Sequence, residues 1–180
     1  MTHNGHVDIR PASLADVDTV ADLAARTFPL ACPDHMTDEN ISAFIAANLN
    51  AAAFAGFVSG TEYTLSLGTI DGEIRGYLLL VDEGDVQFIS KCYVDEHAHG
   101  SGLAALLMND AIATARARGA HTMRLGVNRH NERATAFYTR HGFEIVGTRM
   151  FTVGDQVEND YVLERSLIIG SEISENSERS

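Results

Sequence analysis

The chain has 180 residues, 45% of them hydrophobic, which suffices for one domain with a substantial core and is too short for two ordinary domains. Its 25 acidic and 13 basic residues leave a formal net charge of −12, which argues against a nucleic-acid partner because such binding depends on Lys and Arg neutralising phosphates. No stretch approaches the roughly 18 to 20 apolar residues of a membrane helix, and residues 1–6 lack the apolar region of a secretion signal. We therefore expect a cytoplasmic protein with no membrane partner.

The first half of the chain predicts a strand, two capped helices and three further strands, at residues 7–10, 13–26, 37–49, 62–68, 74–81 and 86–94. Pro29 and Pro33 predict a loop between the two helices. The turns at Asp71-Gly72 and residues 82–85 are short, which implies an antiparallel meander of the three strands.

The second half predicts a helix, a strand, a second helix and two strands, at residues 103–118, 122–127, 132–141, 143–151 and 159–166. Gly119 and Gly142 are expected to stop the two helices. A strand, a crossover helix and a second strand make a right-handed βαβ unit with parallel strands. The predicted fold class is therefore α/β, in the mixed α+β sense, with a mostly antiparallel sheet and helices on both faces. We expect one domain at residues 7–168, with flexible ends at 1–6 and 169–180.

The loop at residues 99–104 (HGSGLA) is the segment with the clearest chemical meaning. It leads from a strand into a helix start, where unpaired N–H groups and the positive end of the helix dipole attract an anion. Gly100 and Gly102 let the backbone approach that anion closely. With Ala105 the loop also fits the dinucleotide fingerprint G-x-G-x-x-A, but that motif belongs on a first strand and needs a later acidic residue, where this chain has Asn128.

Three segments together resemble the GNAT N-acetyltransferases: HGSGLA at 99–104 following Val94, NERATAFY at 131–138, and Gly142-Phe143. The first resembles R/Q-x-x-G-x-G/A, which binds the pyrophosphate of acetyl-CoA in that family, and the second resembles N-x-x-A-x-x-F-Y-x-x-x-G-F. The resemblance implies a GNAT-like sheet with a splayed parallel strand pair and acetyl-CoA as the cosubstrate. The cofactor-binding residues that it implies are Cys92, Tyr93, Val94, His99, Gly100, Ser101, Gly102, Leu103, Ala104, Ala105 and Asn131.

The resemblance also implies roles for individual groups. Backbone groups of Cys92 and Val94 are expected to bind the pantetheine arm like an added strand, and a backbone N–H there to stabilise the oxyanion. Tyr138 is the expected catalytic acid, because a phenol beside the sulfur can protonate the leaving thiolate. His99 stands where the family usually has Arg or Gln, so the loop keeps its N–H donors without a lasting positive charge at neutral pH.

The proton acceptor and the acetyl acceptor are less determined. Some family members carry Glu where this chain has Gly126, so no general base is assigned here. Five histidines are candidates: His35, His97, His99, His121 and His130. No metal site is predicted, and Cys92 is not expected to carry the acetyl group, because a covalent route would need an activating base beside it.

Acceptor selection is expected at residues 28–36 and in the hairpin at 151–161. The chain is similar to the polyamine (spermidine/spermine) N-acetyltransferase branch, which implies direct transfer to a primary amine, either a polyamine or another small cationic amine. Three further acceptors stay open, namely a protein N-terminus, an antibiotic and an amino acid. A non-catalytic acetyl-CoA sensor also stays open, as does a homodimer.

Overall fold

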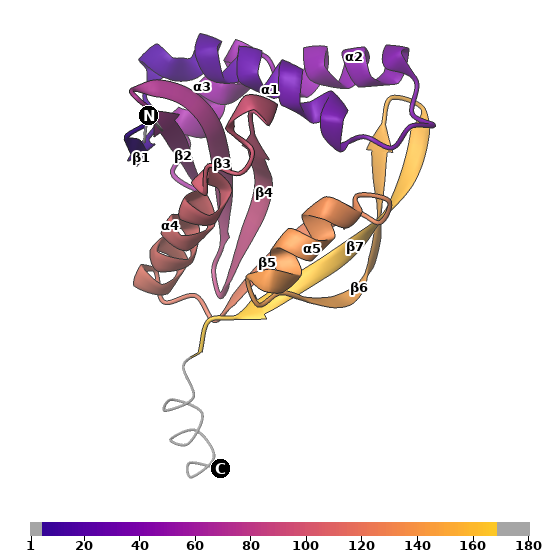
Figure 1. Cartoon of the computed structure of the whole chain (residues 1–180). Helices are drawn as coiled ribbons and strands as arrows, with labels where there is room; N and C mark the ends of the chain where they lie inside the picture. Colours follow the sequence, from indigo (N-terminus) through magenta and orange to yellow (C-terminus); the bar gives the residue numbers. More distant parts are fainter. Residues whose placement is uncertain (1–4, 169–180) are drawn as a thin grey trace.

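The computed structural model describes residues 5–168, so the predicted flexible ends lie outside the described residues apart from Gly5 and His6. Seven strands form one sheet in the order β1-β2-β3-β4-β5-β7-β6, with helices on both faces (Figure 1). The strands are β1 (Val7–Pro11), β2 (Tyr63–Ile70), β3 (Glu73–Glu83), β4 (Val86–Val94), β5 (Thr122–Asn128), β6 (Glu144–Val153) and β7 (Gln156–Ser166). The helices are α1 (Val17–Ala31), α2 (Asp38–Asn48), α3 (Ala51–Ser59), α4 (Leu103–Ala117) and α5 (Glu132–Arg140), with single 3-10 turns at Leu14–Asp16 and Glu96–Ala98.

The predicted fold class is confirmed. Strands β2, β3 and β4 form the expected antiparallel meander, in which Asp71 and Gly72 both adopt positive φ, as a two-residue hairpin turn requires. Helix α4 crosses over from β4 to β5, and these two strands are the one parallel pair in the described sheet. Every other neighbouring pair is antiparallel.

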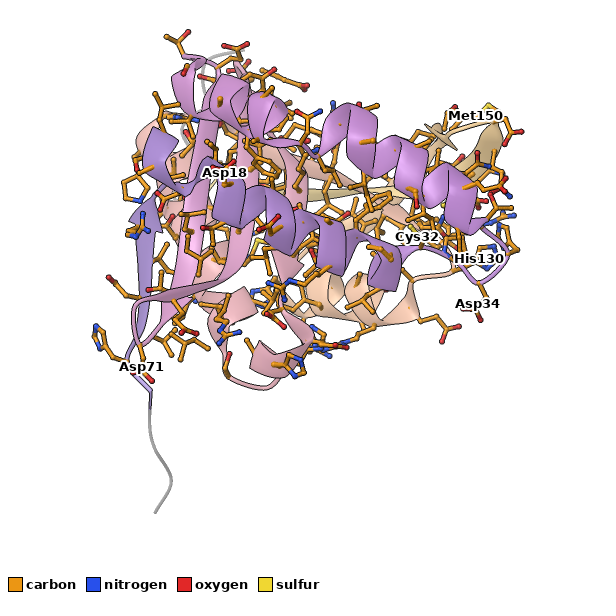
Figure 2. The ribbon with its side chains drawn as sticks, turned by 90° about the horizontal axis from the view of Figure 1, so that it is seen from above. Asp18, Cys32, Asp34, Asp71, His130 and Met150 are labelled. Carbon is orange, nitrogen blue, oxygen red and sulfur yellow. The ribbon has the colours of Figure 1, made fainter. Side chains whose placement is uncertain are left out.

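Two hydrophobic cores lie on opposite faces of the sheet. One contains Leu103, Leu107 and Met108 of α4 packed on the strands, and it extends to Tyr138 of α5. The other lies under α1, α2 and α3, which cover the sheet in the view from above (Figure 2), and includes Leu23 and Phe54. Burial on both faces explains why β3 reads as a nearly continuous apolar run in its middle.

The helical region before β2 differs from the sequence prediction. The prediction of a loop at Pro29 is wrong, since α1 continues through this residue to Ala31. Pro29 removes one backbone hydrogen bond in the last turns, and the stacking of Phe28 on Phe44 at 4.6 Å between ring centroids holds that end of α1 against α2. Helix α3 was not predicted, although Asn50 caps it by accepting a hydrogen bond from the Ala53 N–H.

The helices are short compared with a membrane span. Among residues 5–168 no single helix is long and apolar enough to span one. Helices α2 and α3 reach that length and composition only when taken together across a 43° bend.

The sheet opens between β4 and β5. These strands pair only from Val86 to Ile89, opposite Thr122 to Leu125. At the next residue the register of β4 against β3 shifts, so that Ser90 has no partner in the ladder. A bulge of this kind bends the strand, and the ends of β4 and β5 then separate. The predicted splayed pair is therefore present, and the gap that it leaves is where the candidate site lies.

Candidate active site

A cleft with a volume of about 630 Å³ occupies the gap between the ends of β4 and β5. Its walls come from the second half of β4, the loop before α4, the end of β5, helix α5, the hairpin of β6 and β7, and the end of α1 with the residues that follow it. All but one of the predicted cofactor-binding residues line this cleft, the exception being Ser101. Tyr138 lines it as well. Cys92 and Tyr138, which lie 46 positions apart in the chain, thus share one cavity.

The backbone of β4 offers free hydrogen-bonding groups to the cleft. The Asp95 N–H donates to the Arg75 carbonyl at 2.7 Å, on the β3 side. Because backbone groups alternate sides along a strand, Tyr93 also faces β3, whereas Cys92 and Val94 point their N–H and C=O groups toward β5. The ladder to β5 has already ended there. This geometry suits an extended chain with amide groups, such as pantetheine, lying along β4.

The start of α4 forms an anion cradle. Gly102 is the N-cap of the helix, with φ +84°, and Gly100 has φ +83°. The N–H groups of Ala104 and Ala105 have no acceptor among residues 5–168, as expected of a first helical turn. A Cβ added at either glycine would meet nothing within 4 Å, so the space above the loop is open. Free donors, a helix dipole and open space fit a pyrophosphate group.

Two side chains of this loop hold the loop itself. The Ser101 hydroxyl donates to the Ala98 carbonyl at 2.6 Å and accepts from the Leu103 N–H at 3.3 Å. The His99 ring Nε2 lies 3.1 Å from the Val94 carbonyl oxygen, and because a carbonyl only accepts, Nε2 carries the hydrogen. The His99 ring therefore covers one of the backbone acceptors of β4.

Asp95 anchors the same loop to the rest of the fold. Its side chain is almost fully buried, and its Oδ2 accepts from Arg26 at 3.0 Å and from Arg75 at 3.4 Å. Burial alone would raise the pKa of Asp95, but the hydrogen bonds from Arg26, the His97 N–H and Arg75 outweigh it and lower the pKa below its usual value. The ionised carboxylate therefore ties α1, β3 and the loop together.

Helix α5 brings Tyr138 to the cleft. Asn131 caps the helix by accepting from the Ala134 N–H at 3.1 Å, and Gly142 ends it with φ +84°, as predicted. Tyr138 is 8% exposed and packs edge-on against Phe143 at 5.8 Å between centroids. Tyr138 and Cys92 on β4 lie close enough for each to affect the pKa of the other.

Burial governs the acidity of these groups. It raises the pKa of Tyr138 well above its usual value, with smaller contributions from Cys92 and Tyr93, so the phenol keeps its proton at neutral pH. Burial also raises the pKa of the Cys92 thiol to about 12. Burial therefore makes a thiolate unstable in this part of the cleft, and a sulfur that leaves here with a negative charge is driven to take up a proton.

The far end of the cleft is mainly apolar and is closed by contacts between two distant segments. Phe28, Met36, Phe151 and Val153 line it. The loop after α1 is bound to the hairpin of β6 and β7 through His35 Nε2, which lies 2.6 Å from Glu158 Oε1. The same contact region includes the Thr37 N–H donating to Gln156 and Asn40 donating to Asp155. In Figure 2 Cys32, Asp34 and His130 lie at this end of the molecule.

Comparisons with known proteins agree with this geometry. Residues 17–143 match the model of the acetyltransferase (GNAT) family. An uncharacterized N-acetyltransferase of Mycobacterium tuberculosis is 45% identical over 157 residues, which cover 86% of this chain and all of that protein. The chain belongs to the GNAT acetyltransferase family. The predictions of an N-acetyltransferase that uses acetyl-CoA as its cosubstrate are thereby confirmed.

Two solved structures share the fold of this GNAT enzyme. The PaiA N-acetyltransferase from Thermoplasma acidophilum, solved in complex with coenzyme A, has a TM-score of 0.79 at 17% identity, covering 89% of this chain and 99% of that one. The ribosomal-protein-S18-alanine N-acetyltransferase from Escherichia coli has a TM-score of 0.68 at 19% identity, covering 92% and 96%. At these identities the likeness concerns the fold.

The sequence did not indicate Arg149, whereas Asp160 lies within the hairpin at 151–161 where acceptor selection was expected. Arg149 on β6 and Asp160 on β7 both line the cleft of this GNAT enzyme, and Arg149 Nη2 lies 3.3 Å from Asp160 Oδ2. The sequence signal for this ion pair was the acidic residue Asp160 within the predicted strand 159–166. An acidic side chain on the buried face of a strand needs a partner. The Arg149 guanidinium lies directly over Gly126, where a Cβ would collide with it.

The five candidate histidines are dispersed. Only His99 lines the cleft within the described part of the chain. His97 is 77% exposed beside Glu96, and His121 lies near Asp85. His35 and His130 pack edge to face, 5.6 Å apart, outside the cleft lining.

Proposed function

We propose that this GNAT enzyme transfers the acetyl group of acetyl-CoA directly to a primary amine while both substrates are bound. The proposal is supported by one observation: Tyr138 lines the cleft at the gap between β4 and β5, together with Gly102, Ala104 and Ala105 of the α4 cradle. The pyrophosphate of acetyl-CoA binds at Gly100, Gly102 and the first turn of α4, and its pantetheine arm lies along Cys92 and Val94. Asn131 closes the cofactor site from the start of α5.

In this arrangement the thioester lies between Tyr138 and the acceptor end of the cleft. The amine nitrogen attacks the carbonyl carbon, a backbone N–H of β4 stabilises the oxyanion, and Tyr138 donates its proton to the sulfur as the C–S bond breaks. The raised pKa of Tyr138 does not oppose this step, because the same desolvation raises the pKa of a thiol there, as it does for Cys92. Cys92 is protonated at neutral pH and carries no acetyl group.

The acceptor is a small amine that is cationic in solution, and polyamines belong to this class. A small acceptor is supported by the closure of the far end of the cleft through the bonds between the loop after α1 and the hairpin. A cationic acceptor is supported by Asp160, the one carboxylate among the described residues that line the cleft. A protein N-terminus, an amino acid or an antibiotic amine would use the same cofactor half. The E. coli protein with this fold is a ribosomal-protein-S18-alanine N-acetyltransferase, so the fold does not choose among these acceptors.

The test is release of free coenzyme A thiol from acetyl-CoA in the presence of single acceptors. The panel contains polyamines, aromatic and aliphatic monoamines, amino acids, aminoglycosides and short peptides, and product mass confirms the addition of one acetyl group. We expect release above background with at least one small amine. Release with peptides alone would shift the acceptor to protein N-termini, and binding of acetyl-CoA without release for any acceptor would support a sensor instead.

A further inference from the structure

The acceptor end of the cleft contains an ion pair built into its wall. Asp160 is 4% exposed, and its Oδ2 accepts from Arg149 Nε at 3.4 Å and Nη2 at 3.3 Å. Arg149 reaches across β7 from β6, with its guanidinium over the rings of Phe88 and Phe151 at 5.3 and 5.8 Å. The two aromatic rings and the lack of a Cβ on Gly126 leave a fitted space for the guanidinium. The orientation of the Asp160 carboxylate is therefore determined by its neighbours.

Asp160 lies within electrostatic range of the groups around the expected thioester. Burial raises the pKa of Tyr93, and Cys32, Cys92 and Asp160 each raise it further, so Asp160 is close enough to Tyr93 to act on it electrostatically. Tyr138 in turn is influenced by Cys92 and Tyr93. Cys92, Tyr93, Tyr138 and Asp160 all line the same cleft.

The other titratable groups that line the cleft are less suited to take a proton from the acceptor amine. The thiols of Cys32 and Cys92 have pKa values raised to about 11 and about 12, so they are already protonated, as are the two tyrosines. Lys91 directs its ammonium to the Phe57 ring of α3, 5.4 Å from the centroid. His99 lies at the opposite end, in the cradle loop, with its ring on the Val94 carbonyl. Among the described residues that line the cleft, Asp160 is the one carboxylate.

We propose that Asp160 is the general base of the reaction and that Arg149 is a positioning residue that holds its carboxylate toward the acceptor nitrogen. The inference rests on the proposed function. An incoming ammonium gives one proton to the Asp160 carboxylate, and the neutral amine attacks the thioester carbonyl with formation of the C–N bond. The C–S bond breaks, and the sulfur takes the Tyr138 proton. The second nitrogen proton replaces the one that Tyr138 gave, and the proton on Asp160 passes to water.

The pH dependence follows from the groups that face Asp160. Burial raises the pKa of Asp160, and Glu158 on β7 adds to this, whereas Arg149 on β6 acts in the opposite direction. Tyr93 on β4 and the uncharged Asn128 on β5 complete its surroundings. The base is active when ionised. We therefore expect kcat/KM of the wild type to fall as the pH drops through the pKa of Asp160, which lies above the usual carboxylate value.

The test compares Asp160→Asn, Asp160→Ala and a control, Glu164→Gln. The control removes another carboxylate of β7 that is paired with an arginine, since Arg124 Nε lies 2.7 Å from Glu164 Oε1, but Glu164 does not line the cleft. We expect Asp160→Asn to lower kcat by about 100- to 10,000-fold, the range for loss of a general base, and to abolish the acid limb of the pH profile. Formate should restore part of the activity of Asp160→Ala. The control should retain the wild-type profile.

Thermal unfolding and acetyl-CoA binding show whether the two Asp160 variants are folded. Both variants should still bind acetyl-CoA because the cofactor half is intact. A rise in KM alone, with unchanged kcat and an unchanged acid limb, would overturn the inference and make Asp160 a binding residue. Unaltered kinetics in Asp160→Asn would overturn it as well. Neither outcome contradicts the proposed function. That function is contradicted only if the wild type itself releases no thiol.

Discussion

Replacement of Gly102 by alanine tests the anion cradle, and Gly119 provides a matched control. Both glycines have positive φ, +84° and +76°, and a Cβ added at either would meet nothing within 4 Å. Gly102 begins α4, whereas Gly119 follows its C-terminal end. An alanine in the left-handed region costs about 1 to 2 kcal/mol, offset in part by about 0.4 to 1 kcal/mol from the stiffer unfolded chain. Each variant should therefore lose about 1 kcal/mol of stability.

For a domain of this size, 1 kcal/mol corresponds to a fall in Tm of about 2 to 4 °C, and both variants should show it. Only Gly102→Ala should weaken acetyl-CoA binding. Its methyl group would occupy the open space of the cradle and displace a phosphate from backbone donors. Loss of one hydrogen bond to a charged group, about 1.5 to 3 kcal/mol, raises Kd by about 10- to 100-fold. Calorimetric titration with acetyl-CoA measures this, and equal Kd values for the two variants would refute the assignment of the cradle.

Two further predictions concern the loop anchor and the cleft thiol. Asp95→Asn should lower Tm at pH 7, by about 2 to 4 °C per kcal/mol lost. The lowered pKa of Asp95 means that its stabilising effect is present above the pKa of the unfolded chain, about 3.9, and fades as the pH falls through the folded value. The Tm difference from wild type should therefore shrink in acid, and a constant difference would contradict the ionic anchor. Cys92→Ala should keep thiol release within about fivefold of wild type, because a thiol with a pKa of about 12 is no nucleophile at neutral pH. An acetylated Cys92 found by mass spectrometry of the quenched wild type would contradict direct transfer.

The cofactor half of the site was predictable because its information is local. The glycines at 100 and 102, the helix that follows them and the capping Asn131 each determine the backbone within a few residues. The order of elements then decides that β4 and β5 are parallel. The bulge at Ser90 opens the sheet. No single residue predicts it, because it depends on the register of β4 against both β3 and β5.

The acceptor half depends on contacts between distant segments, which periodicity does not reveal. Arg149 and Asp160 lie opposite each other on β6 and β7, and Asp160 lies opposite Asn128 on β5. Only this register brings the guanidinium over Gly126. Helix α1 likewise passes Pro29 because Phe28 packs on α2, a tertiary contact that outweighs the local preference of proline. The His35 contact with Glu158 spans 123 positions in the chain.

The most direct test of the proposed chemistry is the rate of thiol release by Tyr138→Phe with the best acceptor at saturating acetyl-CoA. Removal of the leaving-group acid predicts a fall in kcat of about 100-fold or more, with the Kd for acetyl-CoA within about threefold of wild type, because the ring keeps its packing against Phe143. An unchanged kcat would contradict the account and leave Tyr138 as a residue of the hydrophobic core.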